Sequence, residues 1–141
     1  MNVTTASHAS HDELLALFKS EKCTSAFGNI LYSAPAMYDR GWIVEARDDA
    51  GALLGAYCVR QCTKKPQTSL YFITVAPEHR GTGVADALME HMKVGSPHGH
   101  IVLGVLLDNE RARAFYRRHG FVETTPCYQG RGVTMEWSNL L

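Results

Sequence analysis

The chain has 141 residues, 45% of them hydrophobic, and its 14 basic side chains balance 14 acidic ones to a formal net charge of zero. That length fits one domain with a core of ordinary size, so we expect residues 1–141 to form a single domain. The balanced charge excludes a global field that attracts nucleic acid or an anionic membrane. No apolar run approaches the roughly 18 residues that span a bilayer, and no charged N-terminal region precedes an apolar one. We therefore expect a cytoplasmic protein that binds neither nucleic acid nor membrane.

The cysteines predict neither disulfides nor a metal site. A chain of this length with its own core does not need disulfide staples, so we expect Cys23, Cys58, Cys62 and Cys127 to be free thiols. Cys58 and Cys62 are close in sequence, but no second pair of cysteines or histidines has the spacing of a zinc site. We therefore expect no bound metal.

The first half of the chain predicts a helix followed by three strands. Residues 1–10 are small and polar, and we expect them to be frayed. Apolar residues on one side of the segment 11–19 predict a helix, and residues 21–40 predict a short helix and a loop. Three apolar runs, at residues 42–47, 53–62 and 70–75, predict three strands that follow one another as a meander.

The second half alternates helices and strands. In residues 84–93 the apolar side chains share one arc at helical spacing, which predicts a helix that packs on a sheet. Residues 101–107 are apolar on both alternating faces, which predicts a central strand covered on both sides. A helix at 109–119 ends at Gly120, and two short strands follow at 121–125 and 133–137. The order predicts a mixed α/β domain.

A glycine-rich loop, Arg80-Gly81-Thr82-Gly83-Val84-Ala85, stands between the third strand and the following helix. Glycines let a backbone come close to a ligand, and the start of a helix offers unpaired N–H groups and the positive end of a dipole. The loop therefore suits a diphosphate. An ordinary tight turn between strand and helix would use the same residues, and the loop alone leaves both interpretations open.

The helix at 109–119 carries four arginines that flank its apolar arc on both sides. A recognition helix for DNA would gather its basic groups on one side, which disfavours that function. Solvated arginines are the simpler interpretation, and one of them could still reach a phosphate. Tyr116, in the apolar arc, is either a core aromatic or a proton donor.

Two segments together resemble the signature motifs of the GNAT superfamily of CoA-dependent N-acetyltransferases. They are V-x-P-x-x-R-G-x-G-x-A in residues 75–85 and N-x-x-A-x-x-F-Y-x-x-x-G-F in residues 109–121. The resemblance implies one mixed central sheet of about six to seven strands with helices on both faces. It implies that the strands at 70–75 and 101–107 splay apart. It also implies transfer of an acetyl group from acetyl-CoA to a primary amine by direct attack.

The resemblance assigns roles to individual residues. It implies that the backbone of Ile73 and Val75 contacts the pantetheine arm, with the Val75 N–H also stabilising the oxyanion. Tyr116 would protonate the departing thiolate. Further cofactor-binding residues implied by the resemblance are Arg80, Gly81, Thr82, Gly83, Val84, Ala85, Asn109 and Arg118.

The general base and the acceptor stay open. The strand at 70–75 lacks the carboxylate that many family members carry, so Glu45, Glu123, His79 or a water chain are the candidates for the base. Residues 23–38 and 126–132, the second with Tyr128, are expected to select a small-molecule or protein amine. A non-catalytic acyl-CoA-binding module is the alternative function. Acyl-chain preference and oligomeric state, monomer or homodimer, are also open.

Overall fold

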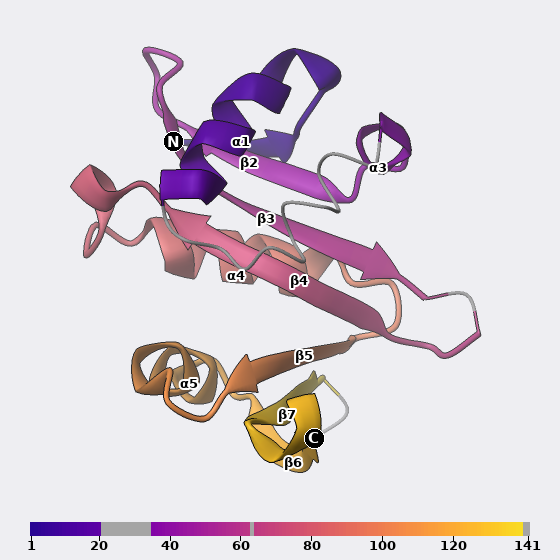
Figure 1. The fold of residues 1–141 in the computed structure, drawn as a ribbon. Helices are drawn as coiled ribbons and strands as arrows, with labels where there is room; N and C mark the ends of the chain where they lie inside the picture. The colour runs from indigo at the N-terminus through magenta and orange to yellow at the C-terminus, as the bar shows by residue number, and fades with distance from the viewer. Residues whose placement is uncertain (21–34, 63, 140–141) are drawn as a thin grey trace. The chain divides into compact units, whose positions relative to one another are not determined.

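The computed structural model describes residues 1–20, 35–62 and 64–139. These residues form a mixed sheet of seven strands in the order β1-β2-β3-β4-β5-β7-β6 (Figure 1), as expected for the fold. The strands are β1 (Asn2–Thr5), β2 (Ile43–Arg47), β3 (Leu53–Gln61), β4 (Thr68–Val75), β5 (His100–Leu106), β6 (Val122–Cys127) and β7 (Gly132–Ser138). The helices are α1 (His11–Ser20), α3 (Pro35–Asp39), α4 (Val84–Gly95) and α5 (Glu110–Arg118), with short 3-10 turns at His8–Ser10, Pro77–His79 and Tyr128–Gly130.

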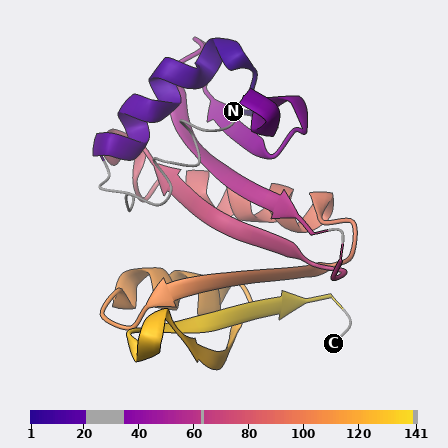
Figure 2. The same ribbon diagram turned by 45° about the vertical axis from the view of Figure 1, so that its right-hand side comes forward.

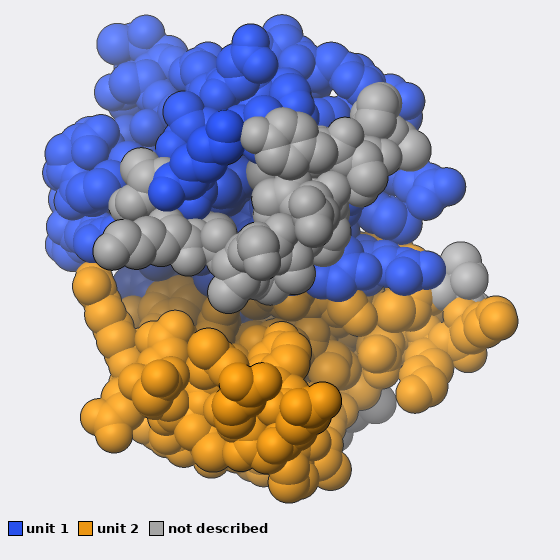
Figure 3. Space-filling model, viewed as in Figure 1, with its two compact units in different colours: residues 1–60, 71–92 blue, residues 61–70, 93–141 orange. Residues whose placement is uncertain are grey.

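The chain divides into two compact units, coloured separately in Figure 3. Unit 1 comprises residues 1–60 and 71–92, and unit 2 comprises residues 61–70 and 93–141. The strand β4 contributes to both. Its parallel ladder with β5 pairs Thr68 with Ile101 and Ser69 with Val102, all in unit 2. The expected splaying of the two strands concerns residues of different units and stays a prediction, as does the single domain.

In unit 1, helices α1 and α4 lie on opposite faces of the strands (Figures 1 and 2). On the α1 face, Phe18 packs against Phe72 of β4 with ring centroids 4.1 Å apart. On the other face α4 buries Val84, Leu88, Met89 and Met92, which confirms the apolar arc predicted from the sequence. This packing fixes the start of α4, and with it the glycine loop, at the end of β4.

The prediction that residues 1–10 are frayed is wrong for residues 2–5. They form β1, which pairs antiparallel with β2 from Asn2–Arg47 to Thr5–Val44. The Ala6 N–H continues this pairing by donating to the Ile43 carbonyl at 2.8 Å. The side chains of β1 are mostly exposed, so backbone hydrogen bonds to the edge of β2, rather than burial, hold the strand.

In unit 2, β5 pairs antiparallel with β7 over seven residues, from His100–Ser138 to Leu106–Gly132. The expectation that both faces of this strand are covered is wrong for its second half. Ile101, Leu103 and Val105 are buried, whereas Gly104 and Leu106 on the other face are exposed. An apolar run has the same appearance in the sequence whether its second face is covered or open.

Cys58, Cys62 and Cys127 are free thiols, and Cys23 lies outside the described residues. In the part of the chain that the structure describes, His, Cys, Asp and Glu nowhere gather in a group of three or more that would suit a metal ion. None of the helices in that part has the length and apolarity needed to cross a lipid bilayer.

Candidate active site

The glycine loop of unit 1 is open at both glycines. Gly81 and Gly83 have φ values of +77° and +88°, and a Cβ built on either would meet no atom within 4 Å. Both conformations favour glycine over residues with a side chain. The Thr82 hydroxyl donates to the His79 carbonyl and so ties the loop to the 3-10 turn before it. The helix α4 then begins at Val84, where the first N–H groups have no partner within the helix.

The two glycines of the loop are not packed against other described residues, so the loop leaves room for an anion. Its glycines are exposed, and the N-terminus of a twelve-residue helix follows directly. A phosphate at this position would gain hydrogen bonds from main-chain N–H groups and a favourable interaction with the helix dipole. Arg80 is exposed beside the glycines and brings a positive charge to the same loop. These residues fit the diphosphate of a nucleotide.

The strand before the loop carries Ile73 and Val75. Both are half-buried, and they alternate with Phe72 and Thr74, which are buried on the opposite face. Residues two apart in a strand share one face, so Ile73 and Val75 present their side chains together. The next residue, Ala76, donates its N–H to the Leu54 carbonyl at 2.8 Å and holds the end of β4 against β3. Unit 1 thus brings Ile73, Val75 and the whole loop together.

Unit 2 brings together the other predicted residues through α5. Asn109 caps this helix, since its side-chain oxygen accepts the Ala112 N–H at 3.2 Å. That bond leaves the side-chain NH2 group as the part of Asn109 able to donate to a ligand. Tyr116 is 9% exposed and packs edge-on against Phe115, with Phe121 on another side. Arg118 is exposed, with its guanidinium 5.5 Å from the centre of the Phe115 ring.

Two of the four arginines of α5 are engaged in ion pairs. Arg113 and Arg117 both bind Glu123 of β6, at 2.8 Å and 3.3 Å. Arg113 also donates to the Leu107 carbonyl at 3.0 Å. These two arginines therefore hold the helix to the end of β5 and to β6.

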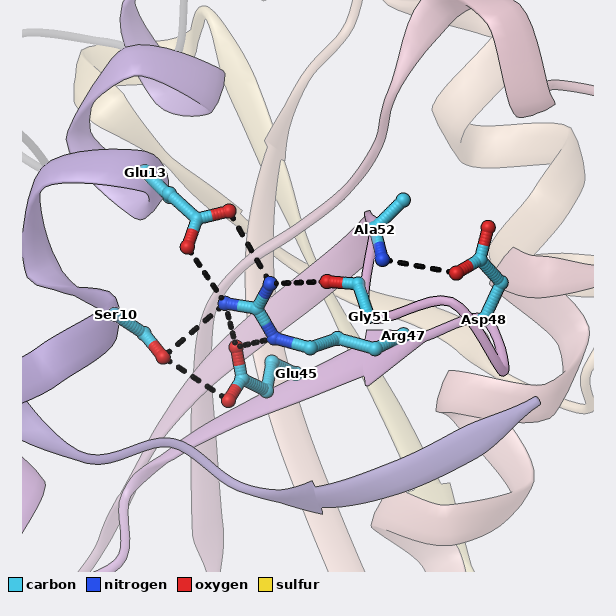
Figure 4. A network of polar contacts seen from close by, with 7 residues as sticks. All are labelled: Ser10, Glu13, Glu45, Arg47, Asp48, Gly51 and Ala52. Atoms are coloured by element: carbon cyan, nitrogen blue, oxygen red, sulfur yellow. Dashed lines mark hydrogen bonds and ion pairs between the residues drawn. The ribbon is translucent and has the colours of Figure 1, made fainter.

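The carboxylates considered as general base are both engaged in ion pairs. Glu45 is buried, accepts a hydrogen bond from the Ser10 hydroxyl at 3.1 Å and pairs with Arg47 at 2.9 Å (Figure 4). Arg47 extends this network to Glu13 and to the Gly51 carbonyl. Hydrogen-bonding to Glu13 is the largest of the causes that raise the pKa of Arg47. Glu123 forms ion pairs with Arg113 and Arg117. Both carboxylates are thus paired with arginine side chains, and the identity of the general base stays a prediction.

One feature of unit 2 was not recognised in the sequence. The segment 126–132, expected to select the acceptor, folds back so that the Tyr128 ring lies over Gly104 of β5, with its hydroxyl 3.5 Å from the Gly104 carbonyl. A glycine inside an otherwise apolar strand often marks the close approach of another group. Gly104 within IVLGVLL carried that signal.

An exposed glycine loop that begins a helix at the end of a sheet strand is typical of domains that bind nucleotide phosphates. Comparison with known proteins narrows this class. A model of the acetyltransferase (GNAT) family matches residues 11–121. The chain therefore belongs to this family.

The relatives agree with that assignment. The chain is 39% identical over 130 residues to a protein of Pseudomonas phage PaMx11 described as 5-NmdU N-acetyltransferase, a match that covers 90% of this chain and 92% of the relative. A crystal structure of a GNAT acetyltransferase from Bacillus cereus has a TM-score of 0.78 at 20% identity and covers 99% of this chain and 98% of its own. The Escherichia coli ribosomal-protein-S18-alanine N-acetyltransferase has a TM-score of 0.71 at 18% identity, with 97% and 92% covered.

The two structures show the shared fold, and the family and the phage relative together establish the activity. The chain is an acyl-CoA-dependent N-acetyltransferase. It is an enzyme, and the non-catalytic alternative is set aside.

Proposed function

We propose that this N-acetyltransferase uses acetyl-CoA as its donor and an amine carried at position 5 of a deoxyuridine as its acceptor. The acceptor rests on one observation, the 39% identity across 90% of this chain to a phage enzyme whose described substrate is 5-NmdU. The donor is supported by the open glycine loop at the start of α4, which suits the diphosphate of coenzyme A.

The donor-site residues in this proposal are the ones that the family resemblance implies. In unit 1 the main-chain N–H groups of the loop bind the two phosphates, and Ile73 and Val75 hydrogen-bond the pantetheine arm through their backbone. In unit 2 the NH2 group of Asn109 donates to the pantetheine side, and Arg118 contacts the nucleotide phosphate. The loop residues in this proposal are Arg80, Gly81, Thr82, Gly83, Val84 and Ala85.

The chemistry requires a neutral amine, a stabilised oxyanion and a proton for the leaving thiolate. The amine nitrogen forms a bond to the thioester carbon, the carbon–sulfur bond breaks, and the amine loses a proton. The Val75 N–H stabilises the oxyanion of the tetrahedral intermediate, and Tyr116 gives its proton to the thiolate. Because Glu45 and Glu123 are held by arginines, His79 or a water chain is left to take up the amine proton.

The same proposal bears on location and partners. Acetyl-CoA and deoxynucleotides are cytoplasmic metabolites, which supports a cytoplasmic location. The 5-substituted base is either part of a free nucleotide or part of DNA, and only the first agrees with the expectation that the chain binds no nucleic acid. That expectation and the homodimer stay predictions.

An acceptor panel with acetyl-CoA, followed by release of free thiol, tests the proposal. The panel holds the 5-NmdU nucleoside, single- and double-stranded DNA containing it, spermidine, a lysine peptide and a peptide with N-terminal alanine. We expect thiol release with at least one 5-NmdU substrate and acetylation of its amine by mass spectrometry. Turnover of spermidine or of a peptide, with none of 5-NmdU in any form, would refute the acceptor and leave the N-acetyltransferase activity intact.

A further inference from the structure

The Tyr128 ring lies on the outer face of β5 and β7 at two positions where these strands carry glycine. A Cβ built on Gly104 would lie 2.8 Å from the Tyr128 hydroxyl oxygen and 3.1 Å from Cζ. A Cβ built on Gly132 would overlap Cδ2 of the same ring. A side chain at either position would push the ring off the sheet, so the two glycines allow it to lie close against the backbone.

The backbone that carries this ring is in a conformation that residues with side chains rarely adopt. Tyr128 has a φ of +51° and Gln129 a φ of +57°, and Gly130 follows at +84°. Glycine would occupy the first two positions without strain. Strain that persists at a loop position is often linked to function, which makes Tyr128 a candidate functional residue.

The surroundings of the ring are open and apolar. Tyr128 is 50% exposed, and Leu106 and Leu107, at the end of β5, are 41% and 42% exposed. In the described part of the chain six large hydrophobic side chains are exposed, and three of them are these. Tyr128, Leu106 and Leu107 all belong to unit 2, as do Gly104, Gly132 and the start of α5 at Asn109. Tyr128 and the two leucines therefore give unit 2 an exposed apolar surface that includes an aromatic ring.

We propose that Tyr128 stacks on the pyrimidine ring of the acceptor and thereby selects planar heterocyclic amines over flexible aliphatic ones. This inference rests on the deoxyuridine acceptor proposed above. Stacking orients the plane of a base through its face, which leaves the amine at the ring edge able to reach the thioester. The glycines fix one face of the tyrosine against the sheet, and the exposed half of the side chain is left for the base.

Steady-state kinetics with acetyl-CoA and the 5-NmdU substrate accepted by the wild type test this inference. Base stacking on an aromatic side chain is strong enough for Tyr128→Leu to raise the acceptor KM about tenfold, with the KM for acetyl-CoA unchanged. Tyr128→Phe keeps the ring and should stay close to wild type. Val122→Ala, at an exposed apolar residue of β6 outside the ring contacts, is the matched control and should change neither KM.

A second variant guards against loss of folding in Tyr128→Leu. Gly104→Ala leaves the tyrosine itself unchanged but places a methyl group where the ring lies, so it should raise the acceptor KM as well. Thermal unfolding with and without coenzyme A identifies which variants are folded and bind the donor. If Tyr128→Leu does not fold, Gly104→Ala and Tyr128→Phe decide the question.

The outcomes separate this inference from the proposed function. If the wild type acetylates 5-NmdU while Tyr128→Leu or a folded Gly104→Ala keeps its acceptor KM, stacking is refuted and the acceptor stands. If Tyr128→Phe loses as much as Tyr128→Leu, the hydroxyl recognises the acceptor and stacking is again refuted. If the wild type accepts aliphatic amines but no 5-NmdU substrate, the acceptor itself is wrong and the inference fails with it. Comparison of the acetylation rates of the 5-NmdU nucleoside and of single- and double-stranded DNA that contain it shows whether the acceptor is free or part of DNA.

Discussion

The two units offer different kinds of chemical group to a ligand. In unit 1 most of the candidate groups belong to the main chain, at Gly81, Gly83 and the first turn of α4, with the charge of Arg80 beside them. In unit 2 they are side chains, namely Asn109, Tyr116 and Tyr128. Substitutions in unit 1 should therefore act through backbone conformation or stability. In unit 2 they should act through the loss of particular atoms.

The side chains of unit 1 with the strongest polar contacts serve the fold, and breaking them should give the largest effect. Arg47→Met leaves the buried Glu45 without its ion pair (Figure 4), which should lower the free energy of unfolding by about 3 kcal/mol. Urea denaturation measures this loss. The kcat of the folded fraction should stay at the wild-type value, because the network contains no residue of the proposed site.

Arg117→Met is the matched control for Arg47→Met. Arg117 also pairs with a glutamate, Glu123, but its side chain is 52% exposed, compared with 21% for Arg47. An ion pair in that setting contributes at most about 1 kcal/mol. Equal losses from the two variants would mean that burial does not distinguish the two networks.

In unit 2 the largest effect should come from removing one oxygen atom. Tyr116→Phe keeps the ring that packs against Phe115 and Phe121 but removes the proposed acid. General acid catalysis contributes about 100-fold or more, so kcat should fall by at least about that factor. The KM for acetyl-CoA should change little. Stopped assays of thiol release measure both constants, and an unchanged kcat would remove Tyr116 from this role.

In the glycine loop of unit 1, Gly83→Ala should act through conformation alone. An added Cβ at Gly83 meets open space, but the φ of +88° is unfavourable for alanine. The loop should shift, and loss of one or two main-chain hydrogen bonds to phosphate should raise the KM for acetyl-CoA about tenfold.

Gly51→Ala is the matched control for Gly83→Ala. Gly51 has a φ of +87° and equally open space, but it lies in the turn between β2 and β3. Both variants should lose about 1–2 kcal/mol of stability. Only Gly83→Ala should alter the KM for acetyl-CoA. An equal rise in KM from both would show that strain anywhere in unit 1, rather than the loop itself, weakens donor binding.

The sequence predicted those parts of the fold whose signals are local. The apolar arc of α4, the glycines of the loop and the Asn109 start of α5 each depend on residues a few positions apart, and the structure has them where expected. The sheet of seven strands was also expected. The two glycines before a helical pattern were the signal for the loop, and both have positive φ in the structure.

The parts that were missed depend on distant residues. β1 is four exposed residues held by the edge of β2, so no hydrophobic alternation marks it. The close approach at Gly104 of β5 involves Tyr128, which lies 24 residues further along the chain. The ion pair between Glu45 and Arg47 also joins Ser10 and Glu13 of the N-terminal segment. A sequence search for a base therefore cannot tell that Glu45 is occupied.

The smallest expected effect is the loss of stability of unit 1 in alkali, because it begins only above pH 9. Burial raises the pKa of Tyr38 and of Cys58 to about 12 each, from ordinary values of 10.0 and 9.0. Because the unfolded chain loses these protons first, stability is complete below pH 9 and declines as the pH rises from 9 toward 12. Urea midpoints at pH 8, 9, 10 and 11 should therefore fall, and less steeply in the double variant Tyr38→Phe/Cys58→Ala.

Tyr38→Phe also removes the hydrogen bond to His11 at 2.8 Å, so the slope with pH, rather than the midpoint at one pH, is the quantity to compare. Equal slopes in wild type and double variant would mean that ionisation elsewhere, such as in unit 2, governs alkaline unfolding.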